Sequence, residues 1–147
     1  MAWRLSRHSA RRSSAPRCLV IADGFYEWKA TASKTKQPYH MHRPDDRPFA
    51  FAGLWERWEK GETPVESCTI ITTDANTFMQ QLHNRMPVIL DAADYGKWMD
   101  PAVQEPGLVL PLLAPCPDDW LAMRPVSTIV NNARNETPQC LSDPQPA

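Results

Sequence analysis

The sequence of 147 residues lacks the features that define several common protein classes. No apolar run approaches the roughly 20 residues that a membrane-spanning helix needs, so we expect no membrane span. The four cysteines, at positions 18, 68, 116 and 140, form no CxxC pair and show no zinc-site spacing. Phosphate-binding glycine motifs are absent, which removes the main support for a nucleotide-binding fold. The formal net charge of -1 gives no global basic field, so any nucleic-acid site must be a local patch.

Proline is the residue type in excess. The 15 prolines are about twice the usual share, and proline breaks helices and central strands. We therefore expect short elements joined by turns. Hydrophobic residues make up 42% and charged residues 22%, which suits one soluble globular domain with a real core.

The residue patterns predict a strand-rich α+β fold with an antiparallel or mixed sheet and short inserted helices. Pro38 has no N–H to give to a ladder, so its strand is expected at a sheet edge, and Gly53 predicts a bulge. Strands are expected at 18–21, 25–29, 38–43, 48–55, 67–73, 88–90 and 121–127.

Helix signals are fewer. Asp74 or Asn76 is expected to cap a helix that ends before Pro87, and Asp91 is expected to cap a second one. Residues 100–119 contain five prolines and are expected to form a loop. The tail from position 138 is expected to fray.

Glu27 is the first candidate for proton chemistry. Because alternate side chains of a strand share a face, Phe25, Glu27 and Lys29 are expected on one face, and Tyr26 and Trp28 on the other. A carboxyl group held among aromatic rings is partly desolvated and can pass protons near neutral pH. The alternative is an exposed glutamate that pairs with Lys29 or with a neighbouring strand.

His83 and Arg85 form the second candidate site. The imidazole stands where the first expected helix ends and can titrate near physiological pH. The planar guanidinium of Arg85 suits a phosphate or a carboxylate. The alternative is that both side chains bond the last carbonyls of the helix.

Residues 1–17 are basic, with five arginines, several serines and no acid. This composition fits an organelle transit peptide, and it equally fits a surface segment that contacts phosphates. Trp3 lies among the arginines and is the best candidate for stacking on a base. The segment has no apolar secretory region.

Four stretches together resemble one family, the SOS-response-associated peptidase (SRAP) family. The stretches stand in the family's order and cover residues 17–136. They are 17–29 (RCLVIADGFYEWK), which resembles RCL-x-PADGFYEW; 37–39, which resembles the KQPY strand; 69–75 with 83–90, which resemble TT-x-A…H-x-RMPVIL; and 126–131, which resembles VS-x-x-VN.

This resemblance implies a fold and a function. The fold would be a twisted, open-barrel-like antiparallel or mixed sheet. The function would be abasic-site processing: the protein binds abasic single-stranded DNA, and an N-terminal cysteine forms a covalent crosslink to the lesion. The family is also catalogued as a peptidase that removes its own first residue, so the resemblance implies hydrolase and lyase-type chemistry. We expect no metal or organic cofactor, a monomer, and a cytoplasmic protein, with organelle targeting by residues 1–17 left open.

The resemblance also assigns roles to individual residues. Glu27 and His83 match the catalytic glutamate and histidine, Arg85 would hold a DNA phosphate, and Thr72 lies where the family's strand faces the DNA. Imine formation needs a proton donor for the departing water, and a carboxyl group with an imidazole can supply the proton transfers. This assignment requires Glu27 and His83 to converge on one cavity.

The sequence departs from the family at its start, which reads Met1-Ala2-Trp3 instead of Met-Cys-Gly-Arg. We therefore expect a partial SRAP domain that lacks the family's N-terminal portion and is less stable than an intact member. The expected division is a basic segment at 1–16, the partial domain at 17–137 and a tail at 138–147. An alternative function is that of a catalytically inactive DNA-binding remnant or an inert fragment. An upstream reading frame opening with Met-Cys would support truncation.

Overall fold

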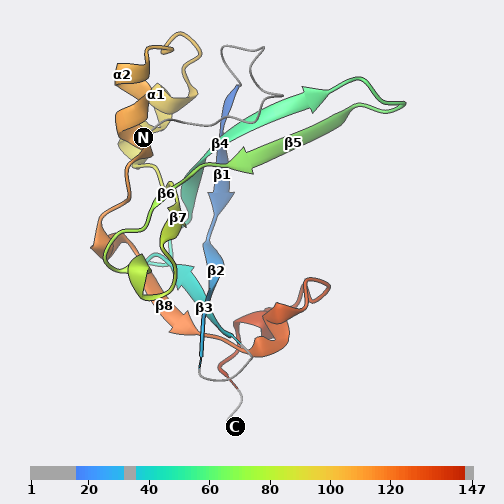
Figure 1. Cartoon of the computed structure of the whole chain (residues 1–147), viewed down its shortest axis with the longest axis vertical. Coiled ribbons are helices and arrows are strands. Elements are labelled where there is room, and N and C mark those ends of the chain that lie inside the picture. Colours follow the sequence, from blue (N-terminus) through green and yellow to red (C-terminus); the bar gives the residue numbers. More distant parts are fainter. Residues whose placement is uncertain (1–15, 32–35, 145–147) are drawn as a thin grey trace.

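The computed structural model of the chain describes residues 16–31 and 36–144, and in these ranges the strands form three small antiparallel sheets (Figure 1). This confirms the strand-rich α+β class, with the strands divided over three sheets. The first sheet has the strand order β1 (Arg17–Ala22), β4 (Phe49–Trp58), β5 (Val65–Ile70). The second sheet has the strand order β2 (Gly24–Lys29), β3 (Gln37–His42), β8 (Ala122–Pro125). The third sheet pairs β6 (Thr72–Asp74) with β7 (Arg85–Pro87).

Helical segments in the described ranges are short, as the proline content predicts. The caps are also as expected, because the Asn76 and Asp91 side chains accept from the N–H groups of Met79 and Ala93, both at 2.9 Å. The first expected helix is, however, only one 3-10 turn. The α-helices are α1 (Tyr95–Met99) and α2 (Pro106–Val109), and the 3-10 turns are η1 (Met79–Gln81), η2 (Ala92–Asp94), η3 (Leu110–Leu113), η4 (Asp118–Trp120), η5 (Thr128–Asn131) and η6 (Pro138–Leu141).

The chain passes from the first sheet to the second at Asp23, between β1 and β2. Both strands lie at sheet edges, and Ile21 at this edge is 64% exposed. The expected alternation in β2 is confirmed, since Tyr26 and Trp28 share a face, with ring centroids 6.4 Å apart. On the other face Glu27 stands directly opposite Tyr39.

The prediction that Pro38 marks an edge strand is wrong. β3 lies between β2 and β8, and Pro38 is fully buried. The ladder with β8 begins one residue later, at Tyr39, and Pro38 contributes its carbonyl to the Val126 N–H at 3.0 Å. The Val126 carbonyl, which faces the missing N–H of Pro38, accepts instead from Gln37 Nε2 at 2.8 Å, so the proline leaves no hydrogen bond unmade here.

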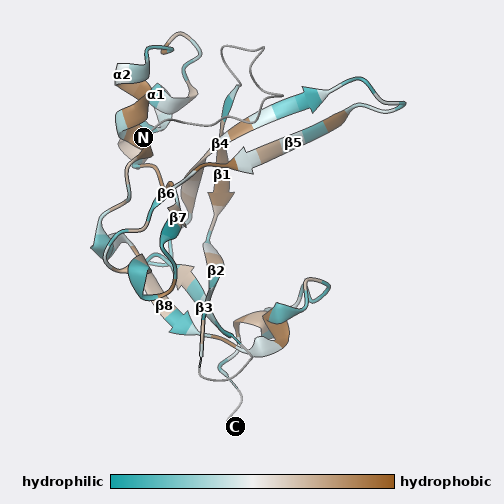
Figure 2. Ribbon diagram, viewed as in Figure 1, coloured by the Kyte–Doolittle hydropathy of each residue, from teal (hydrophilic) through white to brown (hydrophobic). Residues whose placement is uncertain are grey.

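The predicted bulge at Gly53 is not observed, because the register between β4 and β1 runs through this residue without interruption and the ladder between β4 and β5 ends at it. The close approach of β1 side chains to the Gly53 backbone explains the glycine instead. A Cβ placed there would lie 2.8 Å from Cys18 Sγ and 3.0 Å from Val20 Cγ2. β4 then continues to Trp58, into the region expected to be a charged loop, and with β5 forms a projecting hairpin whose tip is hydrophilic (Figure 2).

The strand expected at 88–90 starts earlier, as β7, because Arg85–Pro87 pairs with β6. The following residues still pair with β4 through an isolated bridge between Ile89 and Phe51. Residues 100–119 are not all loop, since α2, η3 and η4 lie there; Pro106 and Pro111 occupy first-turn positions, where a missing N–H is tolerated.

The core consists of two hydrophobic clusters. One joins Met41, Phe51, Met79 and Met86, with Phe25 packed against it. The other contains Ala52, Val88 and the fully buried Trp98 of α1. No helix in the described ranges is long and apolar enough to span a membrane.

Arg17 and Trp98 join α1 to the first sheet. The Trp98 indole N–H donates to the Cys18 carbonyl at 2.9 Å. The Arg17 guanidinium lies 5.5 Å from the indole centroid and donates to the carbonyls of Trp98, Asp100 and Val103. Arg17 thus satisfies carbonyls that the end of a helix leaves without partners.

The tail expected to fray is packed as far as the described residues extend, to position 144. Cys140 in η6 is buried, and Ser127 N–H donates to the Ser142 carbonyl at 2.8 Å. Arg124 of β8 donates to the Leu141 carbonyl, also at 2.8 Å. The proposed boundary at 137 stays a prediction, but η6 belongs to the packed structure.

His40 of β3 should make stability depend on pH. Its Nδ1 is buried without a partner in the described ranges, and its ring stacks on His42 with centroids 5.4 Å apart. Burial, with smaller contributions from His42 and Arg124, lowers the pKa of His40 below its ordinary 6.5. The unfolded chain therefore binds this proton first as the pH falls. We therefore expect His40 to leave the free energy of unfolding undiminished above pH 6.5 and to lower it progressively at lower pH.

Urea unfolding of the wild type and His40→Gln at pH 7.5 and 5 measures this effect. The substitution removes the titrating ring and should flatten the pH dependence. An equal loss of stability in both proteins at pH 5 would assign the dependence to other groups.

Candidate functional site

The β6–β7 pair and the turn between its strands carry three of the four candidate residues. Met86 points into the core and is 1% exposed. Because side chains alternate along a strand, Arg85 points to the opposite, exposed face, together with Thr72 and Asp74. The antiparallel register sets Asp74 directly opposite Arg85.

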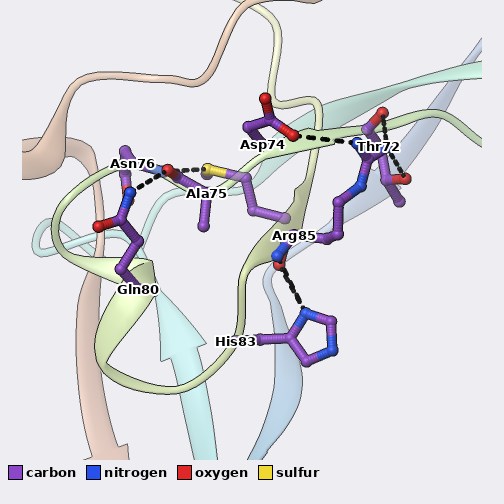
Figure 3. A network of polar contacts seen from close by, with 8 residues as sticks. Thr72, Asp74, Ala75, Asn76, Gln80, His83 and Arg85 are labelled. Atoms are coloured by element: carbon purple, nitrogen blue, oxygen red, sulfur yellow. Dashed lines mark hydrogen bonds and ion pairs between the residues drawn. The ribbon is translucent and has the colours of Figure 1, made fainter.

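The Arg85 guanidinium is held by its two neighbours on β6 (Figure 3). Nη2 donates to the Thr72 carbonyl at 2.7 Å and to Thr72 Oγ1 at 2.8 Å, and Nη1 donates to Asp74 Oδ1 at 3.2 Å. The two residues assigned to DNA by the resemblance, Thr72 and Arg85, are thus in direct contact, and their DNA-binding role stays a prediction. The alternative that Arg85 caps helix carbonyls is wrong, because its acceptors lie on a strand.

The His83 ring lies beside the backbone of Arg85. Its Nδ1 is 3.0 Å from the Arg85 amide nitrogen and 3.2 Å from the Arg85 carbonyl oxygen. The amide can only donate, and its contact is the shorter one, so we assign Nδ1 as the acceptor. A neutral ring with this hydrogen bond carries its proton on Nε2. The ring is exposed, so Nε2 can exchange a proton with a bound molecule.

Glu27 is half-buried on β2. The next residue, Trp28, stands opposite Pro38 of β3, and the Pro38 carbonyl faces Val126 on the other side. The Trp28 N–H therefore points away from β3, to the open edge of the sheet. Glu27 Oε1 accepts from this N–H at 3.1 Å. The carboxylate thus lies at the edge of the sheet, and Trp28 is also held through its indole N–H, which donates to Asn131 Oδ1 at 2.7 Å.

The structure brings Thr72, His83 and Arg85 together, whereas the Glu27 carboxylate bonds the Trp28 amide on another sheet. Both groups nevertheless flank the same core cluster. Phe25 and Tyr39, on the face of Glu27, pack against it; Leu82, before His83, also packs against it, and Met86, after Arg85, belongs to it. Convergence of Glu27 and His83 on one cavity stays a prediction.

Metal binding and the reactivity of the Cys18 and Cys116 thiols can be judged from the described residues. These contain no cluster of three or more histidine, cysteine or acidic side chains that could hold a metal ion. Burial raises the pKa of Cys116 to about 11, and burial together with Cys68 raises the pKa of Cys18. Less thiolate makes both thiols weaker nucleophiles.

Two features of the polar site were missed or misplaced by the sequence patterns. The sequence pattern offers Asp74 as a helix cap, whereas the structure shows it as the ion-pair partner of Arg85. Only the strand register reveals this partnership. Arg17, counted with the basic segment, is occupied by the carbonyls at the end of α1. The other arginines of that segment, and Trp3, lie outside the described residues.

The chain is similar in sequence to proteins of one known family. The sequence model of the SOS response associated peptidase (SRAP) family matches residues 6–133. The chain is 40% identical over 126 residues to "Abasic site processing protein YoqW" of Bacillus subtilis (strain 168), covering 85% of this chain and 56% of that protein. It is 38% identical over 146 residues to "Abasic site processing protein HMCES" of Gallus gallus, covering 85% of this chain and 43% of that protein.

Solved structures share the fold. A crystal structure of a protein from Bacteroides thetaiotaomicron superposes with a TM-score of 0.78 at 26% identity, over 87% of this chain and 56% of that one. A phage-related protein from Bordetella bronchiseptica gives a TM-score of 0.60 at 35% identity, over 76% of this chain and 53% of that one. The chain thus spans about half the length of the proteins it matches.

Proposed function

The chain belongs to the SOS response associated peptidase (SRAP) family, and on that premise we propose that it processes abasic sites in single-stranded DNA. The main observation behind this proposal is an exposed corner of the β6–β7 pair, formed by Thr72, His83 and Arg85. There Thr72 orients Arg85 beside His83. Relatives with 38–41% identity are named abasic site processing proteins, which supports this reading of the corner.

Arg85 is the DNA anchor in this proposal. Its guanidinium is partly exposed and held in one orientation by Thr72, so little side-chain freedom is lost when a phosphate binds. A guanidinium also forms strong charge-assisted hydrogen bonds to phosphate oxygens. Since the whole chain carries a net charge of -1, binding would depend on this local cation and not on a global field.

His83 and Glu27 would transfer the protons. An amine that attacks the ring-opened C1′ aldehyde first gives a carbinolamine, which loses water to form an imine. The departing hydroxyl needs a proton, and the attacking nitrogen must give one up. The Nε2–H of His83 and the half-buried carboxyl group of Glu27 suit these two roles.

The covalent step also needs an α-amine and a thiol on one residue, so that the thiol can add to the imine carbon and close a thiazolidine ring. Cysteines 18, 68, 116 and 140 stand inside the chain, and their nitrogens are amides. The nucleophile of the proposed reaction is therefore an N-terminal cysteine that these 147 residues do not contain. The chain as printed is expected to bind abasic single-stranded DNA without crosslinking to it.

Substituting Arg85 tests the anchor. We expect Arg85→Ala to bind a single strand with a tetrahydrofuran abasic analogue about tenfold more weakly, because it loses one phosphate contact. The slope of log affinity against log salt should fall by about 0.7, the value for one contact on a single strand. Fluorescence anisotropy at several salt concentrations measures both quantities.

Arg134→Ala is the matched control, since it removes an arginine from the exposed segment after η5. Equal salt slopes for the wild type and Arg85→Ala would reject Arg85 as the anchor. The absence of any binding by the wild type at low salt would favour the inert fragment over both the enzyme and a non-catalytic DNA-binding remnant.

A further inference from the structure

Arg85 meets an opposing charge at the position where it would receive a phosphate. Two neutral oxygens of Thr72 accept hydrogen bonds from Nη2, and they orient the guanidinium without reducing its charge. Nη1 instead faces the carboxylate of Asp74, 3.2 Å away. Figure 3 shows Asp74 and Thr72 on the same strand, both directed at Arg85.

We propose that Asp74 competes with the DNA phosphate for Arg85 and thereby weakens the affinity of the site. This inference rests on the proposed function, and it adds a residue that tunes binding. While no DNA is bound, the Asp74 carboxylate occupies the position beside Arg85 Nη1 that a phosphate would take. A phosphate that reaches Nη1 must displace the carboxylate or bind next to it.

The exposure of the pair makes this exchange possible. The Asp74 side chain is 83% exposed and that of Arg85 47%. Exposed ion pairs contribute little to stability, because water and salt screen them and two side chains lose freedom. Asp74 is therefore not needed to hold β6 against β7, and its carboxylate can turn into solvent without disturbing the strands.

Asp74→Asn tests the competition, because it removes the charge and keeps the size of the side chain. We expect about fourfold tighter binding of the tetrahydrofuran-containing strand at low salt, the size of one unit-charge attraction at about 5 Å in water, because the phosphate no longer has to displace the Asp74 carboxylate from Arg85. The gain should shrink to less than about twofold near 0.5 M salt, where the Debye length is shorter than the separation of the charges. Asp119→Asn makes the same change in net charge on an exposed residue of η4 and should change affinity much less.

A double-mutant cycle separates competition at Arg85 from general electrostatics. If Asp74 acts through Arg85, the gain from Asp74→Asn disappears in the Arg85→Ala background. An equal gain in both backgrounds, or no gain in the wild-type background, overturns the inference. Asp74→Ser provides a second uncharged variant, and thermal unfolding confirms that each protein is folded.

The outcomes also distinguish this inference from the proposed function. If Arg85→Ala weakens binding and Asp74→Asn leaves it unchanged, the anchor stands and the competition is wrong. If the wild type and Arg85→Ala bind equally weakly at low salt, the anchor is wrong and the competition is wrong with it.

Discussion

Trp98→Ala is expected to lose about 3–5 kcal/mol of unfolding free energy, the range for truncating a large buried aromatic side chain. Trp98 is 1% exposed, so the substitution leaves a cavity in the second core cluster. It also removes the indole N–H that bonds Cys18 and the ring beneath Arg17. Domains of this size are stable by only about 5–15 kcal/mol, so the variant should be partly unfolded near 37 °C.

Urea denaturation measures this loss, and two further variants interpret it. Trp98→Phe keeps most of the ring volume but loses the indole N–H, so it should cost clearly less than alanine. Trp58→Ala removes a tryptophan that is 50% exposed on the projecting hairpin, and its expected effect is within about 0.5 kcal/mol. Similar losses for Trp58→Ala and Trp98→Ala would show that the α1 contact is not a principal source of stability.

Glu27→Gln and His83→Ala are each expected to slow covalent trapping of abasic single-stranded DNA about a hundredfold, the usual lower contribution of a positioned acid or base. The measurement requires an extended chain that opens with Met-Cys, because the thiazolidine needs an N-terminal cysteine. Glutamine retains an oxygen for the Trp28 N–H, so Glu27→Gln changes the proton chemistry and keeps the local hydrogen bond.

Non-covalent binding of the tetrahydrofuran analogue provides the control for this experiment. It should be nearly unchanged in both variants, because neither residue is assigned to phosphate binding. Glu62→Gln, on the exposed turn of the β4–β5 hairpin, should trap DNA at the rate of the unsubstituted chain. Trapping at that same rate by Glu27→Gln and His83→Ala would remove both residues from the mechanism.

The sequence alone determined the features that depend on local chemistry. Alternation placed Glu27 opposite the face of Tyr26 and Trp28, and the side chains of Asn76 and Asp91 identified the caps. Proline excess predicted short elements, and the order of the motifs identified the family. These inferences succeeded because each depends on composition, on residues near one another in the chain or on the order of short motifs, and none depends on which strands pair.

The tertiary structure decided the features that depend on which strands become neighbours. Pro38 is tolerated in a central strand because the Gln37 side chain donates to the Val126 carbonyl in place of the missing N–H. Gly53 is required because the pairing of β1 with β4 brings Cys18 close to its Cα. The partnership of Asp74 with Arg85 arises in the same way, from the register of β6 and β7. Residues that are distant in sequence meet only through such pairing, and a single sequence does not encode the register in any local pattern.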